Sequence, residues 1–359
     1  MRFPMRVLIL APCVFPHVTG NAVTVERWRR ALSREGVAVE VLSAQTTAPA
    51  AFVECLRRFS PDVIHVHHAF RAGTLLLDPS VAAACTGCAV VISPGGTDIN
   101  VDLEVPDRER AVAAVFRMAR AVIVQSKETA DHLRRRMPDA DRKFAFVPKA
   151  VCWFGDEPYD LRKIAGCDHG NLIFFLPAGI RPVKGNLECL QAMEKVHVAR
   201  PHVRFVAAGP AIDAEYAGRF EREVRRLSTF AVWIDGIPPA AMRSAYEASD
   251  IVVNASFSEG LSNSLLEALA GGRPVLASNI PGNWWPVLGS SGDAPAGLLF
   301  DPYDAGAFLE NALRLTDGPD LRSEFGQASR SRGMSLPSPE DEADGLVAAY
   351  EKALGARIP

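Results

Sequence analysis

Short apolar runs alternate with amphipathic stretches along nearly the whole chain. In the first half these runs are rich in Val and Ile and lack the polar alternation of a half-exposed strand. They lie at residues 7–11, 37–42, 63–66, 89–92, 121–124 and 144–147. Such runs are typical of strands buried on both faces of a parallel sheet. The segments between them, such as Val23–Arg34 and Arg110–Arg120, have helical spacing, which predicts a doubly wound α/β domain.

The alternation stops after Val147 and restarts at Leu172. Further apolar runs predict a second parallel sheet, at residues 172–176, 203–208, 232–234, 251–253, 274–277 and 297–300. We therefore expect an N-terminal Rossmann-like domain over 1–150, a linker over 151–170 and a second Rossmann-like domain over 171–335. An amphipathic helix is predicted at Glu342–Leu354, within a last segment 336–359 for which packing against the first domain is one option.

Charge and hydropathy exclude two classes of partner. The chain has 359 residues, with 39 Lys and Arg against 42 Asp and Glu, so it lacks the basic excess of a nucleic-acid binder. No apolar run approaches the roughly 20 residues that span a bilayer, so we expect no stable membrane insertion. The apolar start is interrupted by Pro12 and Pro16, which favours a buried strand over a signal peptide. A cytoplasmic protein of unknown oligomeric state is expected.

The cysteines and clustered histidines raise the question of a metal or redox site. Seven scattered cysteines do not form the dense pattern of a disulfide framework. Cys85 and Cys88 have CxxC spacing, but no second pair follows at zinc-site distance, which favours buried thiols. His65, His67 and His68 end the third predicted strand, where a metal cluster or an acceptor contact by His68 are the functional alternatives.

Two loops of the first half are candidate ligand loops, because ligands of open α/β sheets bind at the carboxyl ends of the strands. The loop 11–21 lacks the GxGxxG pattern of a dinucleotide site. Gly20 and Asn21, at the start of a helix, either present backbone N–H groups to an anion or only close a turn. In the loop 93–100, Gly95 and Gly96 allow close approach of a ligand, and Asp98 either binds hydroxyls or caps a turn.

Two loops of the second half carry charge at strand ends. Arg181 and Lys184 follow the run 172–176, where two cations suit a diphosphate or are simply solvated. The predicted strand 203–208 is followed by Gly209 and Pro210, whose backbone is expected to be accessible at the same edge of the sheet.

The loop 254–262 gives the sharpest signal. Glu259 precedes a helix that starts near Ser262, and Glu267 follows eight residues after Glu259. The first-turn N–H groups of that helix suit phosphate or sugar oxygens, although an acidic residue there is also a common capping device.

Together these motifs resemble the retaining glycosyltransferases of family 4, or glycosyltransferase group 1. That family has the GT-B fold, in which two Rossmann-like domains face each other across a cleft. The segments that carry the resemblance lie between residues 17 and 283 and read HVTGNAVTVER, GGTDIN, RPVK, SEGLSNSLLEA and PVLASNIPGN.

The resemblance implies a role for each candidate residue. Glu259 would bind hydroxyls of the donor sugar, Glu267 the ribose of the nucleotide, and Arg181 with Lys184 the leaving diphosphate. The other donor-side residues would be Gly20, Asn21, Gly209, Pro210, Gly260, Leu261, Ser262 and Asn263. The acceptor side would include His17, Thr24, His68, Gly96, Thr97, Asp98 and Asn100. The implied donor is a UDP-sugar, and neither a metal nor a further cofactor is implied.

Two departures from the family pattern keep alternatives open. Many members carry a histidine that helps to hold the donor sugar where this chain has Gly95, and the spacing from Arg181 to Lys184 is shorter than is common. The missing histidine is consistent with a catalytically weak nucleotide-sugar-binding protein. A GT-B epimerase would need its own acid/base carboxylates, and none stands out in the first half. The acceptor is open: a saccharide, a lipid, a small metabolite, or a thiol or selenium nucleophile.

Overall fold

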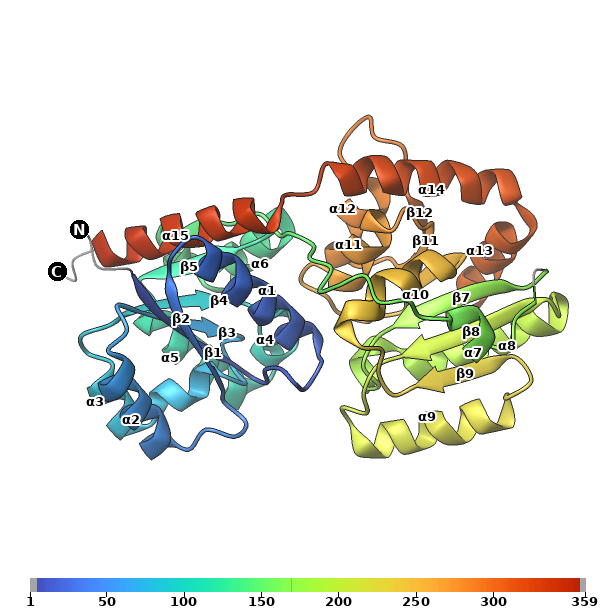
Figure 1. The fold of residues 1–359 in the computed structure, drawn as a ribbon. Helices are drawn as coiled ribbons and strands as arrows, with labels where there is room; N and C mark the ends of the chain where they lie inside the picture. Colours follow the sequence, from blue (N-terminus) through green and yellow to red (C-terminus); the bar gives the residue numbers. More distant parts are fainter. Residues whose placement is uncertain (1–4, 169, 356–359) are drawn as a thin grey trace. The chain divides into compact units, whose positions relative to one another are not determined.

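The computed structural model describes residues 5–168 and 170–355 and divides the chain into two compact units (Figure 1). The first unit runs to Cys152 and also takes in the chain from Pro337 onward. The second runs from Trp153 to Leu336. Each unit is built around its own six-stranded sheet, in which every strand pairing is parallel.

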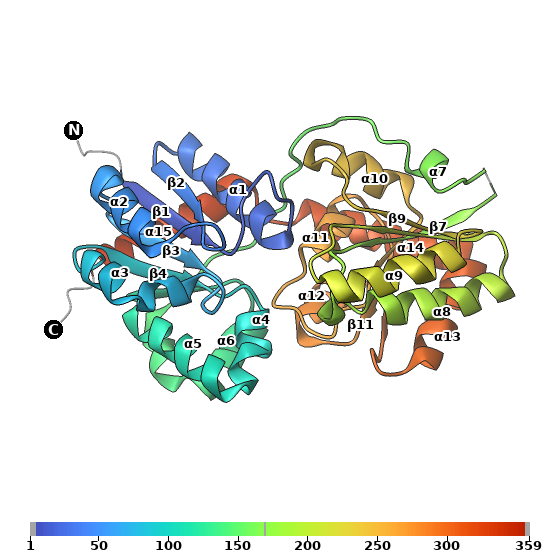
Figure 2. The same ribbon diagram turned by 90° about the horizontal axis from the view of Figure 1, so that it is seen from below.

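The first sheet has the strand order β2-β1-β3-β4-β5-β6. Its strands are β1 (Arg6–Ala11), β2 (Ala38–Ser43), β3 (Val63–His67), β4 (Ala89–Ser93), β5 (Ala121–Val124) and β6 (Phe144–Phe146). One face is covered by α1 (Gly20–Arg34) and α15 (Pro339–Gly355), which lie side by side (Figure 1). The other face carries α2 (Pro49–Phe59), α3 (Pro79–Ala84), α5 (Pro106–Met118) and α6 (Lys127–Arg136) (Figure 2).

Helix α15 is fastened to the first unit by buried polar contacts. The Arg27 guanidinium donates two hydrogen bonds to the Glu342 carboxylate, with N···O distances of 2.5 and 3.0 Å, and both side chains are almost fully buried. Gln125 Nε2 donates to the same carboxylate at 2.9 Å. Farther along α15, the Tyr350 hydroxyl is hydrogen-bonded to His65 Nδ1 at 2.8 Å. A buried ion pair that lost one partner would leave an uncompensated charge, so these contacts fix where α15 packs.

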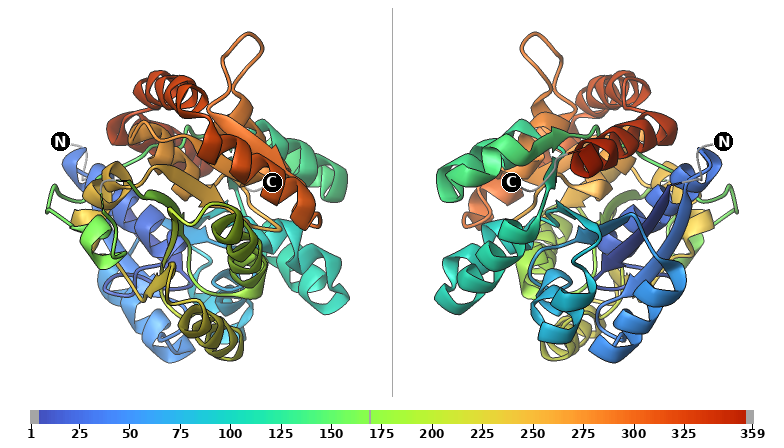
Figure 3. Two further views of the ribbon diagram at one scale, coloured as in Figure 1. Left: turned by 90° about the vertical axis from the view of Figure 1, so that its right-hand side faces the viewer. Right: turned by 90° about the vertical axis from the view of Figure 1, so that its left-hand side faces the viewer.

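The second sheet has the order β12-β11-β10-β7-β8-β9. Its strands are β7 (Leu172–Pro177), β8 (Val203–Ala208), β9 (Ala231–Ile234), β10 (Ile251–Asn254), β11 (Val275–Ser278) and β12 (Gly297–Phe300). Helices α8 (Asn186–Ala199), α9 (Ala214–Arg226) and α13 (Ala305–Asp317) pack on one face. On the other lie α7 (Leu161–Ile164), α10 (Met242–Ala248), α11 (Asn263–Ala270) and α12 (Pro281–Leu288). Figure 3 shows the sheet between these layers, and α14 (Pro319–Met334) packs against α11.

Every predicted strand lies within one residue of an observed one. Helix starts were less predictable than strands. The predicted helix begins at Arg110, whereas α5 begins at Pro106, since proline is favoured at the first helical position. A linker was expected over 151–170, whereas the second unit already begins at Trp153. There Tyr159 N donates to Ser244 Oγ at 2.9 Å, and Arg162 pairs with Asp250 at 3.1 Å.

All seven cysteines are free thiols. Burial, reinforced by the neighbouring Cys88, raises the pKa of the Cys85 thiol to about 12, so this CxxC pair lacks the reactive thiolate of a redox site. Among the described helices none combines the length and the apolar character that crossing a bilayer requires.

Candidate functional site

The candidate residues of the second unit gather at the carboxyl edge of its sheet. The loops after β7 and β8 are joined there, since Ile180 N donates to Pro210 O at 2.8 Å and Ile180 forms a β-bridge with Ala211. The backbone of Gly209 packs so closely on the carbonyl of Ala178 that any side chain at 209 would overlap it. Gly209 and Pro210 therefore lie beside the loop that carries Arg181 and Lys184.

The loop after β7 is also joined to the loop after β10. Gly185 adopts a left-handed conformation with φ of 61°, and a Cβ there would collide with the carbonyl oxygen of Ala255. Phe257 N donates to Val183 O at 2.9 Å. Only a glycine permits both the backbone angle and the close approach. The contact brings together two segments some seventy residues apart in sequence.

That junction places Lys184 against Glu259. Lys184 Nζ lies 2.5 Å from Glu259 Oε1, and the two side chains are only 18% and 13% exposed. Ser256 Oγ donates to the same oxygen at 2.7 Å, and Asn254 Nδ2 approaches it at 3.3 Å. Burial alone would raise the pKa of the Glu259 carboxyl, but the Lys184 ammonium and these hydrogen bonds outweigh burial and lower it. Glu259 is therefore held as a carboxylate at neutral pH.

Arg181 directly precedes the 3₁₀ turn Pro182–Lys184, and Lys184 is its last residue. Arg181 N donates to Asn186 Oδ1 at 3.2 Å, and Lys184 N donates to Arg181 O at 3.0 Å, which fixes the backbone between them. Both cationic residues thus belong to one rigid turn at the strand end.

Helix α11 begins at Asn263 and is preceded by Gly260, Leu261 and Ser262. Ser262 is the N-cap residue, but its side chain accepts no hydrogen bond from the first turn. Its hydroxyl is instead held by Asn254 Nδ2 at 2.9 Å and Ser264 Oγ at 3.0 Å. The helix start therefore lacks the usual side-chain cap, the arrangement in which an anionic ligand can satisfy the N–H groups.

Glu267 lies within α11 and is held by a buried tyrosine. The Tyr246 hydroxyl donates to Glu267 Oε2 at 2.7 Å. Burial, with the neighbouring Glu267 carboxylate, raises the pKa of Tyr246, so the phenol stays protonated and able to donate. This orients a carboxylate that the sequence alone could place only by its spacing.

In the first unit, one group of candidates surrounds the start of α1. Gly20 is the first residue of the helix, and the N-cap Thr19 Oγ1 accepts from Ala22 N at 3.3 Å. Gly20 and His17 are exposed, and Asn21 is partly exposed. Thr24 is only 3% exposed, and its hydroxyl donates to Gly20 O at 2.9 Å.

The loop 94–100 is organised around Asp98, which is fully buried. Its carboxylate accepts N–H bonds from Ala69 at 2.7 Å, Gly96 at 2.9 Å and Gly95 at 3.0 Å. Of the two alternatives for Asp98, the contacts give it the turn-stabilising role. Gly96, Thr97 and Asn100 lie in the segment that this carboxylate holds, and Thr97 and Asn100 remain partly exposed.

The imidazole of His68 occupies the space in which a side chain at position 95 would lie. A Cβ on Gly95 would be 2.8 Å from His68 Cδ2. His68 is 1% exposed, its Nδ1 accepts from Arg71 N at 3.1 Å, and its Nε2 lies 2.9 Å from Thr97 Oγ1. The Nδ1 acceptor places the ring proton on Nε2, which donates to Thr97. Glycine at 95 is therefore the residue that this packing of His68 requires.

His65 and His67 form a buried cluster with Trp28. The Trp28 ring stacks on His65 at 4.9 Å and meets His67 edge-on at 5.1 Å. Both histidines contact Ser93 Oγ at 2.9 Å. Burial lowers the pKa of each imidazole to about 3, so both are neutral at neutral pH. Within residues 5–168 and 170–355, no three His, Cys, Asp or Glu side chains gather in a metal-binding arrangement.

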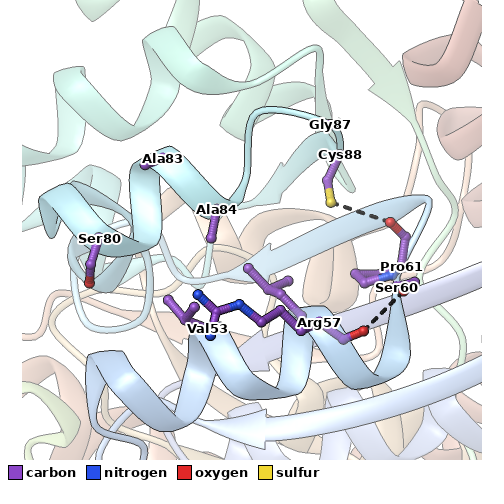
Figure 4. Close-up of a pocket in the computed structure, with 10 residues that line it drawn as sticks. Val53, Arg57, Ser60, Pro61, Ser80, Ala83, Ala84, Gly87 and Cys88 are labelled. Atoms are coloured by element: carbon purple, nitrogen blue, oxygen red, sulfur yellow. Dashed lines mark hydrogen bonds between the residues drawn. The ribbon is translucent and has the colours of Figure 1, made fainter.

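A cavity of about 580 Å³ lies at the opposite, amino edge of the first sheet (Figure 4). It is lined by α2 and α3 together with the segments before β3 and β4, where Cys88 Sγ donates to Pro61 O at 3.3 Å. None of the candidate ligand residues lines this cavity.

Comparison with known families assigns both halves of the chain. A model described as Glycosyltransferase Family 4 matches residues 44–151, and one described as Glycosyl transferases group 1 matches residues 170–317. Each half of the chain thus matches a glycosyltransferase family, and its two parallel sheets have the fold of solved GT-B glycosyltransferases. The second match contains Arg181, Lys184, Glu259 and Glu267. The expectation of two Rossmann-like domains is confirmed by the two parallel sheets.

Relatives and solved structures agree with this assignment. The glycosyltransferase 1 domain-containing protein 1 of Xenopus tropicalis is 28% identical, over 89% of this chain and 89% of that protein. A D-inositol 3-phosphate glycosyltransferase of Segniliparus rotundus is 28% identical over 90% of this chain and 75% of its own length. Sucrose-phosphate synthase from Thermosynechococcus elongatus has a TM-score of 0.79 at 18% identity, covering 97% and 98% of the two chains. HepE from Anabaena, solved with UDP and glucose, has a TM-score of 0.77 at 15% identity, covering 97% and 99%.

Sequence reasoning missed several residues that shape the candidate site. Asn254 and Ser256 lie within the loop 254–262, but their positions in the sequence do not reveal that both contact Glu259. Tyr246 gives no sequence signal, since a buried tyrosine on an amphipathic helix is ordinary core material. Its role appears only with the contact to Glu267.

Proposed function

We propose that this glycosyltransferase moves a sugar from a UDP-sugar to an acceptor with retention of configuration at the anomeric carbon. The observation that carries the proposal is the Lys184–Glu259 ion pair at the carboxyl edge of the second sheet, within the segment matched by the group 1 model. It sets a cation suited to diphosphate beside a carboxylate suited to sugar hydroxyls. The UDP donor is supported by HepE, whose structures contain UDP and UDP-glucose.

The proposed reaction places each charge beside a group that stabilises it. As the bond between the anomeric carbon and the diphosphate breaks, the electron pair stays on the leaving phosphate oxygen. Arg181, Lys184 and the N–H groups at the start of α11 oppose that negative charge. The acceptor attacks the anomeric carbon from the same face and gives its proton to the leaving phosphate. Glu259 binds sugar hydroxyls, and its charge favours the oxocarbenium-like sugar ring.

Turnover of a nucleotide sugar tests this proposal. A thermal-shift screen of nucleotide sugars would select the donor, and extracts would then supply acceptors, with products identified by mass spectrometry. The proposal expects release of nucleoside diphosphate together with a sugar-modified acceptor. Donor binding without release would instead favour a nucleotide-sugar-binding protein, and a changed sugar without an acceptor product would favour an epimerase.

Glu267→Ala is expected to weaken the binding of nucleotide sugar and of free nucleoside diphosphate by the same factor, about tenfold. A ribose contact is present in both ligands, so its loss does not distinguish them. Calorimetry with both ligands measures the two affinities. Glu247→Ala is a matched control, because Glu247 is exposed on α10 and its carboxylate pairs with Arg243 at 3.0 Å. A loss confined to the nucleotide sugar would contradict the assignment of Glu267 to the ribose.

Sugar transfer is expected to proceed at an unchanged rate in excess EDTA. Arg181, Lys184 and the α11 amides are proposed to stabilise the diphosphate, the role that a divalent ion has in other transferases. Initial rates with and without EDTA provide the measurement. A rate that falls in EDTA and is restored by magnesium or manganese would show that these groups do not suffice.

A further inference from the structure

Asn283 makes several buried contacts that have no assigned role in the proposed sugar transfer. It lies in the first turn of α12 and is fully buried. Its Nδ2 donates to Ser278 O at 3.0 Å, Ser278 Oγ at 3.1 Å and Asn254 Oδ1 at 3.2 Å. Its Oδ1 accepts no hydrogen bond from the described part of the chain. All its polar contacts are thus donated, and all reach the ends of β10 and β11.

Both side chains that accept a hydrogen bond from Asn283 are linked by further hydrogen bonds to Glu259 Oε1. Asn254, which accepts from Asn283, approaches Glu259 Oε1 with its own Nδ2 at 3.3 Å. Ser278 Oγ, the other neighbour, donates to Ser256 O at 2.5 Å, and Ser256 Oγ donates to Glu259 Oε1 at 2.7 Å. Two hydrogen-bonded routes of different length therefore start at one amide and end at one carboxylate oxygen.

The backbone next to Asn283 also touches Glu259. A Cβ added to Gly282 would lie 2.6 Å from Glu259 O and 2.8 Å from both Glu259 C and Glu259 Cβ. The first turn of α12 therefore packs directly on the main chain of Glu259. The side chain of Asn283 and the backbone of Gly282 hold the residue from two directions.

We infer that Asn283 is a positioning residue that sets the orientation of the Glu259 carboxylate through Asn254 and Ser256. The inference rests on the proposed role of Glu259 in binding the donor sugar. A group that acts on the transition state must be held within a fraction of an ångström, and buried hydrogen bonds behind it provide that precision. The three hydrogen bonds that the Asn283 amide donates reach Asn254 and Ser278, and both of these residues are linked to Glu259.

Asn283→Ala tests the inference through the split between turnover and binding. The variant is expected to lower kcat about tenfold and to leave the affinity for nucleoside diphosphate unchanged, because that ligand lacks the sugar. Ser329→Ala is the matched control, since Ser329 is also fully buried and donates to Arg273 O at 2.7 Å, on α14. The control is expected to lower thermal stability and leave kcat unchanged. Equal kcat in wild type and Asn283→Ala would overturn the inference.

A double-mutant cycle separates positioning from general destabilisation. In the Glu259→Gln background, Asn283→Ala is expected to cause less than about a twofold further loss of kcat, because the group that it positions is already impaired. Additive losses would overturn the inference. Ser278→Ala removes one of the two routes, so it offers a milder variant that is expected to show the same non-additivity if Asn283→Ala does not fold.

A titration of the Glu259 carboxyl keeps this inference separate from the proposed function. NMR of the ¹³C-labelled carboxyl follows its pKa without any substrate. In Asn283→Ala, Asn254 loses the hydrogen bond that holds its amide, so its own hydrogen bond to Glu259 is expected to weaken. The pKa of the Glu259 carboxyl is therefore expected to rise in Asn283→Ala and not in Ser329→Ala. A wild-type protein that transfers no sugar would refute the proposed function, whereas an unchanged Glu259 pKa in Asn283→Ala would refute the positioning role.

Discussion

Glu259→Gln is expected to lower kcat for sugar transfer by about 10²-fold or more while the affinity for nucleoside diphosphate stays nearly unchanged. The carboxylate is proposed to contact the sugar, and its charge becomes more valuable as the ring develops oxocarbenium character. Glutamine has nearly the same shape and still offers an oxygen to Ser256 and Asn254, so the loss reports the charge rather than a cavity. Steady-state kinetics and calorimetry on the same preparations provide the two measurements.

The comparison with Glu267→Ala makes this result diagnostic. Glu267 is proposed to contact the ribose and therefore to affect both ligands alike, whereas Glu259 is proposed to affect only the sugar-bearing one. If Glu259→Gln weakened the binding of free nucleoside diphosphate as much as Glu267→Ala does, the assigned roles would be wrong. We expect no covalent adduct between the sugar and Glu259, and intact-mass spectra of the enzyme with donor alone would reveal one.

The pH dependence of the reaction provides a second measure of the same carboxylate. The pKa of Glu259 is lowered in the folded protein, despite burial, by Lys184, Ser256 and Asn254. A lowered pKa means that the charged form persists to lower pH, and that activity assigned to Glu259 is lost only as pH falls through that lowered value. The acid limb of kcat/KM, which reports the free enzyme, is therefore expected below the ordinary range of a glutamate, where the stability contributed by the ion pair is also lost.

The strands were predictable because parallel strands are buried on both faces. A run such as 172–176 shows this directly in its side chains, and β7 extends over 172–177. Residues 153–170 were not predictable in the same way. Tyr159 and Arg162 attach this segment to the second unit through polar contacts with distant residues, and such contacts leave no periodic pattern in the sequence.

The candidate site was predictable as a set of strand-end residues but not as a set of contacts. The motif resemblance and the strand ends together pointed to Glu259 and Lys184. Their direct contact depends on Gly185, whose left-handed conformation lets one loop pack on the other. Asn283 could not be predicted at all, because its role follows from three hydrogen bonds within a buried network. Spacing in the sequence identifies residues that share one helix or loop, whereas this network joins residues from different strands and a helix.

Arg181→Ala and Lys184→Ala are each expected to weaken the binding of nucleoside diphosphate by roughly 10- to 150-fold, the effect of losing a charged contact worth about 1.5–3 kcal/mol. Lys195→Ala, on the exposed surface of α8, removes the same charge and is expected to have little effect on affinity. Calorimetry at constant ionic strength measures all three variants. Unchanged affinity in both Arg181→Ala and Lys184→Ala would remove these residues from the diphosphate site.

The two cationic variants are expected to differ in a second property, because Lys184 Nζ pairs with Glu259 Oε1 at 2.5 Å. Without the ammonium, burial is opposed less strongly, so the pKa of the Glu259 carboxyl is expected to rise in Lys184→Ala. The acid limb of kcat/KM is then expected to lie at higher pH in Lys184→Ala than in Arg181→Ala. Equal acid limbs in the two variants would show that Lys184 does not control the charge of Glu259.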